Sequence, residues 1–403
     1  MEHDADAIIL GGGMVGATIA GLLAGGGRSV IVVEGSPAGP PPEGGDLRVS
    51  AINRAGIETL RRVGAWARGE QWRHQPFRHL RVWNRDSGAG AAFDATEAGL
   101  DTFGAFVENA VLQQGLEAAL ADHRRVAWRR PATATAFHAD AGAAHLEIDG
   151  ETTLSAPLLI GADGPNSRIR TLCGITTSET DYAQRALIIN VTSDADAAET
   201  TWQRFTPAGP QAWLPLPGGQ ASLVWYGDPG DIRILENLDD DTLAAEIQAA
   251  FPAEVGTIRA VHGRASFPVV RRHARAYAAR RVALVGDAAH SIHPLMGQGL
   301  NLGLQGAESL ADALLAAPGR DPAAALAEYE RAHRPRALAM MAATDACHRL
   351  FTREPGGITG IGDGLLRLAG ATPVGRRPLL RHAMGLSPLG AERPEPGDAG
   401  AHS

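Results

Sequence analysis

The sequence predicts an α/β fold, in which a mostly antiparallel β-sheet domain is inserted into a domain of alternating strands and helices and a helical tail follows. Three observations predict this architecture. Strand and helix patterns alternate near both ends of the chain. Between about residues 180 and 270 the apolar residues instead recur with a period of two, which is typical of half-buried strands. From about residue 322 onward the pattern is helical.

The first strand and the first helix flank a glycine-rich turn. The apolar run Ala7–Leu10 precedes the glycines, and the small, apolar stretch Val15–Ala24 follows them. Gly11, Gly13 and Gly16 have the G-x-G-x-x-G spacing of a Rossmann-like unit. The first glycine permits the tight turn, the second allows the backbone to approach a pyrophosphate, and the third allows the helix to pack on the strand. A pyrophosphate is therefore expected at the N-terminus of this helix.

A carboxylate follows the second strand at the position that a dinucleotide site requires. The apolar run Val30–Val33 ends at Glu34, which lies 23 residues after Gly11. A carboxylate there can accept hydrogen bonds from the ribose hydroxyls of an adenosine. Glu34 is thus a candidate cofactor-binding residue.

Two later apolar strands run into motifs that distinguish a flavin from a nicotinamide site. Leu158–Ile160 leads into Gly161-Ala162-Asp163-Gly164, and Arg281–Val285 leads into Gly286-Asp287. A nicotinamide dehydrogenase needs only the first fingerprint, whereas a flavin must also be held along its ribityl chain. An aspartate that leaves a later strand supplies an acceptor there. The pattern therefore favours a Rossmann-like FAD-binding domain, with Asp163, Gly286 and Asp287 among the cofactor contacts.

The remaining elements follow in chain order. We expect helices at 53–63, 110–120 and from Leu300, and strands at 80–83, near 126, and at 186–191, 201–205, 211–216 and 222–226. The helical tail should break at Pro335, at 355–357 and at Pro373. We expect the FAD-binding domain at 1–75, 105–180 and 270–330, the substrate domain at 76–104 and 181–269, a C-terminal helical region at 331–387, and a disordered tail at 388–403.

Together the three motifs resemble the class A flavoprotein monooxygenases with the p-hydroxybenzoate hydroxylase fold. Three longer stretches are similar to the ubiquinone-biosynthesis hydroxylases of that class. They are Arg48–Asn53, Trp202–Phe205 with the following Gly209-Pro210, and Gly286–Gly303. The last stretch is the most specific signal, and the resemblance covers nearly the whole chain.

The resemblance implies an FAD-dependent monooxygenase that acts on the ring of a polyprenylated phenol or benzoquinone intermediate of ubiquinone biosynthesis, through a flavin hydroperoxide. O2 is the second substrate, and NAD(P)H or a protein reductase supplies the electrons. The loop Pro294–Gly299 precedes a helix, so its N–H groups can face the anionic edge of reduced flavin. The implied catalytic residues are Pro294, Gly297 and Gln298. The implied cofactor contacts include Arg48, Gly297, Gly299, Leu300 and Asn301.

Bulk properties restrict the class of protein. The chain has 403 residues and a formal net charge of -8, which indicates no nucleic-acid footprint. Its two cysteines, Cys173 and Cys347, are far apart and fit no metal spacing, so both are expected to be reduced thiols. The uncharged stretch 7–27 contains eight glycines and follows acidic residues, which is unlike a signal peptide or a membrane span. We therefore expect a cytoplasmic protein with at most peripheral membrane contact.

Several interpretations stay open at this point. His290 and His293 could be acid–base groups, although structural hydrogen bonding is favoured, and Arg204 and Phe205 could line the pocket or face solvent. Arg376, Arg377 and Arg381 could lie near anionic headgroups or form an ordinary solvated cluster. The partners could include a ubiquinone-biosynthesis complex and lipid-binding accessory proteins.

Competing functions are separated by composition and by oxygen use. A flavin halogenase requires a catalytic lysine, and the chain contains none. A Baeyer–Villiger oxygenase would carry a second dinucleotide fingerprint, which the sequence lacks. A monooxygenase of a soluble phenolic compound, a prenyl-reductase and a non-catalytic FAD or quinone scaffold remain as alternatives. A scaffold, however, has no need of a loop shaped around reduced flavin.

Overall fold

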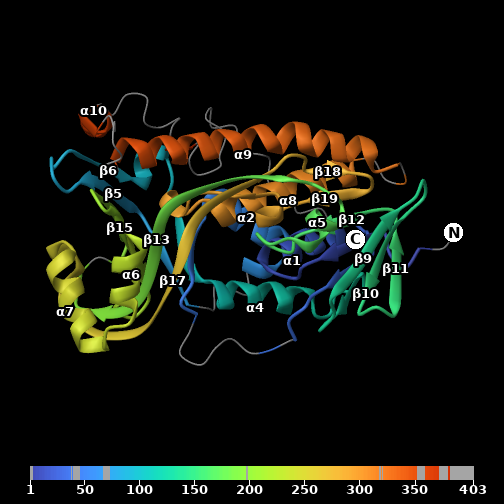
Figure 1. Cartoon of the computed structure of the whole chain (residues 1–403), viewed down its shortest axis with the longest axis horizontal. Helices are drawn as coiled ribbons and strands as arrows, with labels where there is room; N and C mark the ends of the chain where they lie inside the picture. The colour runs from blue at the N-terminus through green and yellow to red at the C-terminus, as the bar shows by residue number, and fades with distance from the viewer. Residues whose placement is uncertain are drawn as a thin grey trace, which may run out of the picture.

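The computed structural model describes residues 3–37, 39, 46–66, 73–196, 198–316, 319, 321–351, 359–371 and 380–381. It confirms the α/β fold class with an inserted, mostly antiparallel sheet and C-terminal helices. Figure 1 shows a large sheet with its helices at one end, a small sheet at the other, and one long helix along the top. The expected tail 388–403 and Arg376 and Arg377 lie outside the described residues.

A six-stranded sheet forms the centre of the first domain. Neighbouring strands run parallel except at the β18 edge. Its strands, in spatial order, are β18 (Ala278–Ala279), β19 (Val282–Leu284), β12 (Leu159–Gly161), β1 (Ala7–Leu10), β2 (Val30–Val33) and β8 (Val126–Arg129). Every residue of β1 and β2 is buried, as expected for parallel strands that are covered on both faces.

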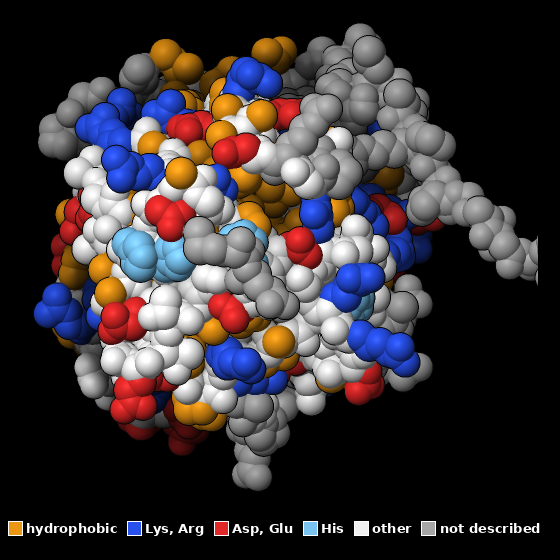
Figure 2. Space-filling view, turned by 90° about the vertical axis from the view of Figure 1, so that its right-hand side faces the viewer, with side chains coloured by type: hydrophobic (Ala, Val, Ile, Leu, Met, Phe, Trp, Pro, Cys, Tyr) orange, Lys and Arg blue, Asp and Glu red, His pale blue; other side chains and the backbone are white. Residues whose placement is uncertain are grey.

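Helices surround this sheet and share its apolar core. They are α1 (Met14–Gly25), α2 (Arg54–Arg62), α4 (Asn109–Leu120), α5 (Arg168–Leu172) and α8 (Gly299–Leu315). A three-stranded antiparallel sheet joins the same core, with strands β9 (Ala134–Ala139), β10 (Ala144–Ile148) and β11 (Thr152–Ala156). This sheet was not predicted from the sequence. On the face turned to the viewer in Figure 2, acidic and basic side chains are interspersed, so that face has no continuous basic surface.

The second domain is built on an eight-stranded, mostly antiparallel sheet. In spatial order its strands are β20 (His290–Ser291), β17 (Ile258–Ala274), β13 (Thr177–Ser193), β16 (Gln220–Gly227), β15 (Gly209–Leu216), β14 (Thr200–Thr206), β5 (His79–Asn84) and β6 (Gly90–Asp94). β13 and β17 are each 17 residues long and pair along their length, from Thr177 opposite Ala274 to Ser193 opposite Ile258. Helices α6 (Pro229–Glu236) and α7 (Asp240–Ala250) contribute to the core of this domain.

The strands of a small antiparallel sheet lie on both sides of β5 and β6 in the sequence. The sheet consists of β3 (Val49–Asn53), β7 (Gly104–Glu108) and β4 (His74–Phe77). Short 3-10 turns connect several elements: η1 (Ala95–Ala98) follows β6, η2 (Ala253–Val255) follows α7, η3 (Gly286–Ala288) follows β19 and η4 (Pro294–Met296) follows β20. η3 and η4 both lie within Gly286–Gly303, the stretch that begins with the third motif. This stretch is a series of turns that leads into α8.

Two helices, α9 (Ala323–Phe351) and α10 (Thr359–Ala371), form the C-terminal region. The predicted break at Pro335 is wrong, because α9 continues through it. Pro335 is exposed, while His333, Ala337 and Met341 are buried, so tertiary packing outweighs the roughly 3 kcal/mol that an internal proline costs a helix. The other two predicted breaks fall outside the described residues. Among the helices that the structure describes, none is long and apolar enough to cross a bilayer.

Arg381 is not on the surface, contrary to its proposed place near anionic headgroups. Its side chain is buried, and Nη1 donates to the carbonyl of Ala98 at 3.4 Å. The neighbouring Leu380 is buried in a cluster with Phe77 and Phe103. Arg381 thus attaches the C-terminal segment to the turn at Ala98.

Candidate active site

In the glycine-rich turn between β1 and α1, two glycines pack closely against other parts of the protein and one faces open space. A Cβ atom on Gly11, whose φ is +98°, would lie 2.4 Å from the carbonyl oxygen of Ala162. A Cβ on Gly16 would lie 1.9 Å from the carbonyl oxygen of Gly11. A Cβ on Gly13 would meet nothing within 4 Å. Gly11 and Gly16 therefore allow close packing within the protein, whereas Gly13 faces free space.

Two side chains hold the peptide of Gly12 in this turn. Glu34, directly after β2, accepts from the N–H of Gly12 at 2.6 Å and, with its other oxygen, from the N–H of Ser36 at 2.8 Å. Gln113 of α4 donates to the carbonyl of Gly12 at 2.8 Å. Glu34 lies at the glycine turn as its spacing predicts, and its contact with a ribose stays a prediction. Gln113 was missed, since no local pattern marks a glutamine whose partner is 101 residues away.

The second motif connects the first motif to the third. Ser167 caps α5 by accepting from the N–H of Arg170 at 3.0 Å. The buried guanidinium of Arg170 donates to the carbonyls of Ala288 at 2.9 Å and Pro165 at 2.8 Å. Ala288 belongs to η3, so Arg170 fixes the turn that carries Asp287.

Asp163 has one structural and one unused carboxylate oxygen. Oδ2 accepts from the N–H groups of Arg168 at 2.6 Å and Ile169 at 3.1 Å, at the start of α5. Oδ1 is buried and has no hydrogen-bond partner among the described residues. The residue therefore supports the fold and still offers one acceptor to a ligand.

The third motif meets the first at Val15. Gly286, whose φ is +59°, would carry a Cβ 3.2 Å from the Val15 side chain, and a Cβ on Gly303 would lie 2.8 Å from the same side chain. These glycines bring η3 and the first turns of α8 against the first turn of α1. The three motifs, which are widely separated in sequence, thus converge at one place.

The N-termini of α1 and α8 lack the side-chain hydrogen-bond caps that several other helices have. Side chains of Asn53, Ser167, Asp228 and Asp239 cap α2, α5, α6 and α7. Within the described residues no side chain caps α1 or α8, and neither has an acidic residue in its first turn; α4 also lacks a side-chain cap. Unpaired N–H groups and the positive end of the helix dipole favour an anionic ligand. The two uncapped helix starts that meet at Val15 can therefore hold anionic groups.

Asp287 is accessible to solvent beside these helix starts. The protein around its carboxyl nevertheless removes part of the hydration of the charged form, and this raises the pKa of Asp287 to about 6. The positive charge of Arg272 lowers the pKa and partly offsets this effect. An acceptor of this kind can bind hydroxyl groups of a ligand. Its predicted contact with a ribityl chain stays a prediction.

The loop from Pro294 to Gly299 is held in shape by Asn301 from α8. The Asn301 side chain is buried, accepts from the N–H of Asn53 at 2.9 Å and donates to the carbonyl of Ala51 at 2.8 Å. Gly297 has a φ of +61°, which is unfavourable for other residues, and Gly299 has open space at its Cβ position. Asn301 is thus a cross-link between α8 and β3, in addition to being a predicted cofactor contact.

The other predicted loop contacts are less specific. Pro294 is half-buried, and Gln298 occupies the N-cap position of α8 without capping it. The side chain of Leu300 packs on the apolar core. Arg48 precedes β3, and its side chain is 72% exposed and 3.5 Å from Asp46. The contacts of these four residues with FAD therefore stay predictions.

His293 supports the loop and is electrically neutral. Its Nδ1 accepts from the N–H of Leu295 at 3.1 Å, so the ring proton is on Nε2. Burial lowers the pKa of His293 to about 3, and the rings of Tyr182, His348 and Tyr226 surround it. The structure thus gives His293 a hydrogen-bonding role, as favoured from the sequence.

His290 forms a buried pair with a histidine from α9. Its Nε2 lies 2.9 Å from Nε2 of His333, and both side chains are buried. Burial lowers the pKa of His290 to about 3 and that of His333 to about 4. Both rings are therefore neutral near pH 7, and this pair attaches α9 to the third motif.

The two residues that were candidates for the pocket wall are buried in the substrate domain. Arg204 donates to Gln211 and to the carbonyl of Ala250 at the end of α7, where a cation is favoured. Phe205 stacks on Phe351 with a centroid distance of 4.0 Å, in a cluster that includes Leu295. Arg204 is therefore structural and does not face solvent, and Phe205 contacts the loop.

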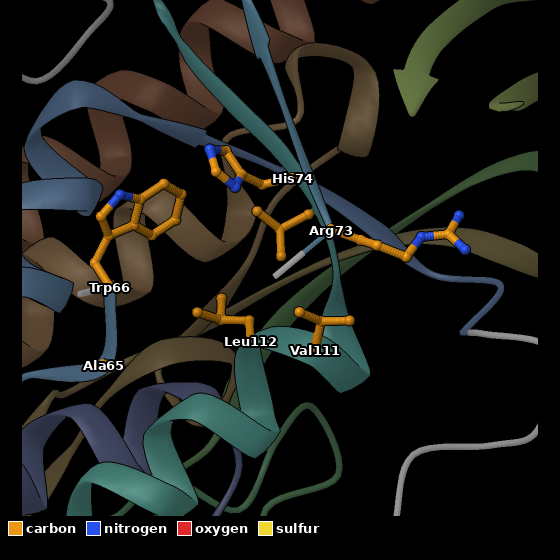
Figure 3. A pocket seen from close by; sticks show the side chains of 7 residues that line it. Ala65, Trp66, Arg73, His74, Val111 and Leu112 are labelled. Carbon is orange, nitrogen blue, oxygen red and sulfur yellow. The ribbon is translucent and has the colours of Figure 1, made fainter. Parts of the chain in front are cut away.

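A separate hollow does not coincide with the predicted site. Figure 3 shows side chains that line it, including Trp66 and His74. The rings of these two residues make an edge-to-face contact, with 5.5 Å between their centroids. Its cavity volume of about 10 Å³ is far below the roughly 300–1,000 Å³ typical of ligand pockets. None of its lining residues belongs to the three motifs. We therefore place the active site at the motifs and not at this hollow.

Comparisons with known proteins agree with this geometry. Residues 4–344 match the family model of the FAD binding domain. The chain is 43% identical over 309 residues to the 3-demethoxyubiquinol 3-hydroxylase of Escherichia coli, covering 76% of this chain and 78% of that protein. It is 36% identical over 400 residues to the ubiquinone hydroxylase UbiL of Rhodospirillum rubrum, covering 97% and 92%. The crystal structure of p-nitrophenol 4-monooxygenase from Pseudomonas putida has the same fold, with a TM-score of 0.80, 21% identity and coverage of 95% and 99%.

Proposed function

The chain belongs to the FAD binding domain family, as an FAD-dependent monooxygenase, and from this premise we propose that it hydroxylates the ring of a polyprenylated phenol or benzoquinone intermediate of ubiquinone biosynthesis. Two ubiquinone-pathway hydroxylases among its relatives support this substrate class. The proposal also includes O2 as the second substrate and NAD(P)H or a protein reductase as the electron donor.

The residues present fit FAD. The free space at Gly13 and the uncapped start of α1 suit a pyrophosphate, and Glu34, which accepts from the N–H of Gly12, would lie near the adenosine. Asp287 and the unpaired Oδ1 of Asp163 would accept hydrogen bonds from hydroxyl groups of the ribityl chain. Convergence of the three motifs at two uncapped helix starts is the observation that carries the proposal.

The loop residues orient the reaction. Bound FAD, once reduced by the electron donor, would supply the chemistry that activates O2, of which one atom would enter the ring of the substrate and the other would leave as water. The N–H groups at the start of α8 would stabilise negative charge on the flavin pyrimidine, and Pro294 would orient the ring through its carbonyl. His293 and Asn301 hold these groups in place through Leu295 and β3.

Neighbouring tyrosines can donate hydrogen bonds but are poor bases. Burial raises the pKa of Tyr182 and of Tyr226 well above the usual value of a phenol. Tyr182 donates to Asp345, which also pairs with Arg271. These phenols stay protonated at neutral pH, so they exclude water and orient polar groups without taking a proton from the substrate.

Peripheral contact with a membrane completes the proposal for the cellular context. A tail of many isoprene units has more apolar surface than a pocket of this domain can cover, and each buried methylene contributes about 0.8 kcal/mol. The tail would therefore stay in a bilayer or in a lipid-binding partner of a biosynthetic complex, while the ring reaches the flavin. We place the protein in the cytoplasm, on the inner face of the membrane.

Oxygen uptake and product formation test the proposal. The purified protein is assayed with a prenylated phenol in detergent micelles and with the same ring without its tail, each with a suitable electron donor. We expect oxygen uptake that matches hydroxylated product, and clearly higher turnover of the prenylated ring. Equal or better turnover of the small phenol would assign the enzyme to soluble aromatic compounds. Quinone profiling of a deletion strain would then name the missing hydroxylation by the intermediate that accumulates.

A further inference from the structure

Large apolar side chains are exposed together on one face of α10. Ile361, Leu365 and Leu368 are 52%, 50% and 60% exposed. The described residues contain six exposed large apolar side chains, and half of them lie on this one helix. Their spacing of four and three residues places them on the same face. A concentrated apolar stripe of this kind marks an interaction surface.

The opposite face of α10 packs against the protein. Leu366 is buried in an apolar cluster with Phe351 of α9 and Phe205 of β14. The same cluster contains Leu295, which belongs to the loop that follows His293. Apolar side chains therefore extend from α10 to the loop of the active site.

Glycines seat α10 closely on its neighbours. A Cβ on Gly362 would lie 2.8 Å from the ring of Phe351, and a Cβ on Gly370 would lie 2.7 Å from the carbonyl oxygen of Gly90 in β6. The helix is thus fixed against α9 and β6, and Figure 1 shows it at the end of the molecule beside these elements. Its apolar stripe is held outward by this packing.

The exposed charge on α10 is positive. The helix has two charged residues, Asp363 and Arg367. Asp363 is half-buried and accepts from Nδ2 of Asn84 at 2.9 Å, whereas Arg367 is exposed. An apolar stripe with a basic neighbour and no exposed acid on the same helix is typical of helices that lie in the surface of an anionic bilayer.

We propose that α10 docks the protein on a lipid bilayer, with Ile361, Leu365 and Leu368 below the headgroups and Arg367 beside anionic lipid. At 13 residues the helix is too short to span a bilayer, so it lies in the surface. Docking there places the apolar cluster of Leu366, Phe205 and Phe351 between the bilayer and the active-site loop. This inference rests on the proposed function, because a polyprenylated substrate dissolved in that bilayer is what gives docking a purpose.

Vesicle co-sedimentation of the full chain with bound FAD tests the docking surface. The variant Ile361→Gln/Leu365→Gln/Leu368→Gln removes the apolar stripe and keeps helix propensity. We expect its binding to phosphatidylcholine vesicles with phosphatidylglycerol to fall by about tenfold or more, because three large side chains no longer enter hydrocarbon. Arg367→Gln should weaken binding to these vesicles and leave binding to pure phosphatidylcholine unchanged.

A matched control lies on another exposed helix. Ile234 of α6 is 65% exposed, so Ile234→Gln removes an equally accessible apolar side chain away from α10. It should bind vesicles as the wild type does. Circular dichroism and FAD content should be the same in all variants, since none of the substituted side chains is buried.

Three outcomes would overturn the inference. One is a wild-type protein that binds neither kind of vesicle, and another is a triple variant that binds as well as the wild type. The third is a wild-type dimer that the triple substitution converts to a monomer with unchanged vesicle binding, because a second copy would then occupy α10. Vesicle binding needs no substrate, so failure to hydroxylate a prenylated phenol would overturn the proposed function alone.

Discussion

Gly13→Val and Gly16→Ala should separate contact with the cofactor from packing within the protein. A Cβ on Gly13 meets nothing within 4 Å, and its φ of -64° suits any residue. A Cβ on Gly16 would lie 1.9 Å from the carbonyl oxygen of Gly11, whereas real Cβ contacts essentially never fall under 3.0 Å. The first change therefore fills ligand space, and the second forces α1 away from the glycine turn.

The expected magnitudes differ between the two variants. Gly13→Val should alter the stability of the apoprotein by about 1 kcal/mol or less, the usual effect of an unfavourable N-cap residue. It should weaken FAD binding roughly 5- to 150-fold, because overpacking against the pyrophosphate costs about 1–3 kcal/mol. Gly16→Ala should incur about 1–3 kcal/mol or more of overpacking in the protein itself, with or without FAD.

Two measurements check this pair. Urea unfolding of the apoproteins, followed by circular dichroism, reports stability, and titration of flavin fluorescence reports FAD affinity. A folded Gly13→Val protein that keeps stoichiometric FAD would refute the assignment of this turn as the pyrophosphate site. An apoprotein with Gly16→Ala that unfolds at the wild-type urea concentration would refute the packing argument.

Four further predictions concern Asp287, the loop glycines and the histidine pair. Asp287→Ala should lower FAD content after gel filtration and leave the apo-fold intact; full occupancy would contradict its contact. Because the pKa of Asp287 is raised from 3.8 to about 6 in the folded state, the folded protein keeps a proton between these pH values that the unfolded chain has lost. The stability of the apoprotein should therefore fall as the pH rises through this range, and urea titrations of Asp287→Asn should not show this fall. A variant with the same pH dependence as the wild type would contradict the raised pKa. Gly297→Val or Gly299→Val should retain FAD but release hydrogen peroxide in place of hydroxylated product; coupled turnover in both would show that the loop is not the active-site element. The pKa values of His290 and His333 are about 3 and about 4, against an ordinary 6.5. Acidification from pH 6.5 toward pH 4 should therefore destabilise the folded protein, because the unfolded chain takes up protons first. In the variant His290→Gln/His333→Gln the urea midpoint should depend less on pH in this range, and an unchanged dependence would contradict the prediction.

Local patterns predicted the parts of the fold that depend on neighbours in sequence. The glycine spacing fixes the turn after β1, and short apolar runs give the buried parallel strands β1 and β2. The period-two runs predicted strands of the antiparallel sheet, although not the 17-residue length of β13 and β17. The β9–β11 sheet was missed because its alanine-rich strands give weak alternation, even though residues 144–148 alternate in burial.

Long-range contacts were not predictable from local pattern. Arg170 reaches Ala288 across 118 positions and Asn301 reaches Asn53 across 248, and neither spacing is periodic. Resemblance to a family pointed to the motifs, but only coordinates show that Asn301 is a cross-link between backbone segments. The break expected at Pro335 failed for a related reason, since burial of the helix on both sides of the proline depends on residues distant in sequence.

During synthesis the central sheet is completed late. β12 pairs with β1 on one side and with β19 on the other, and β19 begins only at Val282, long after β12 ends at Gly161. At about 5–20 residues per second, a ribosome needs roughly 6–24 s to make the intervening segment. For that time β12 presents an apolar, unpaired edge, which is prone to aggregation. Nascent chains that stop before β19 should therefore depend on chaperones, whereas complete chains close the sheet themselves.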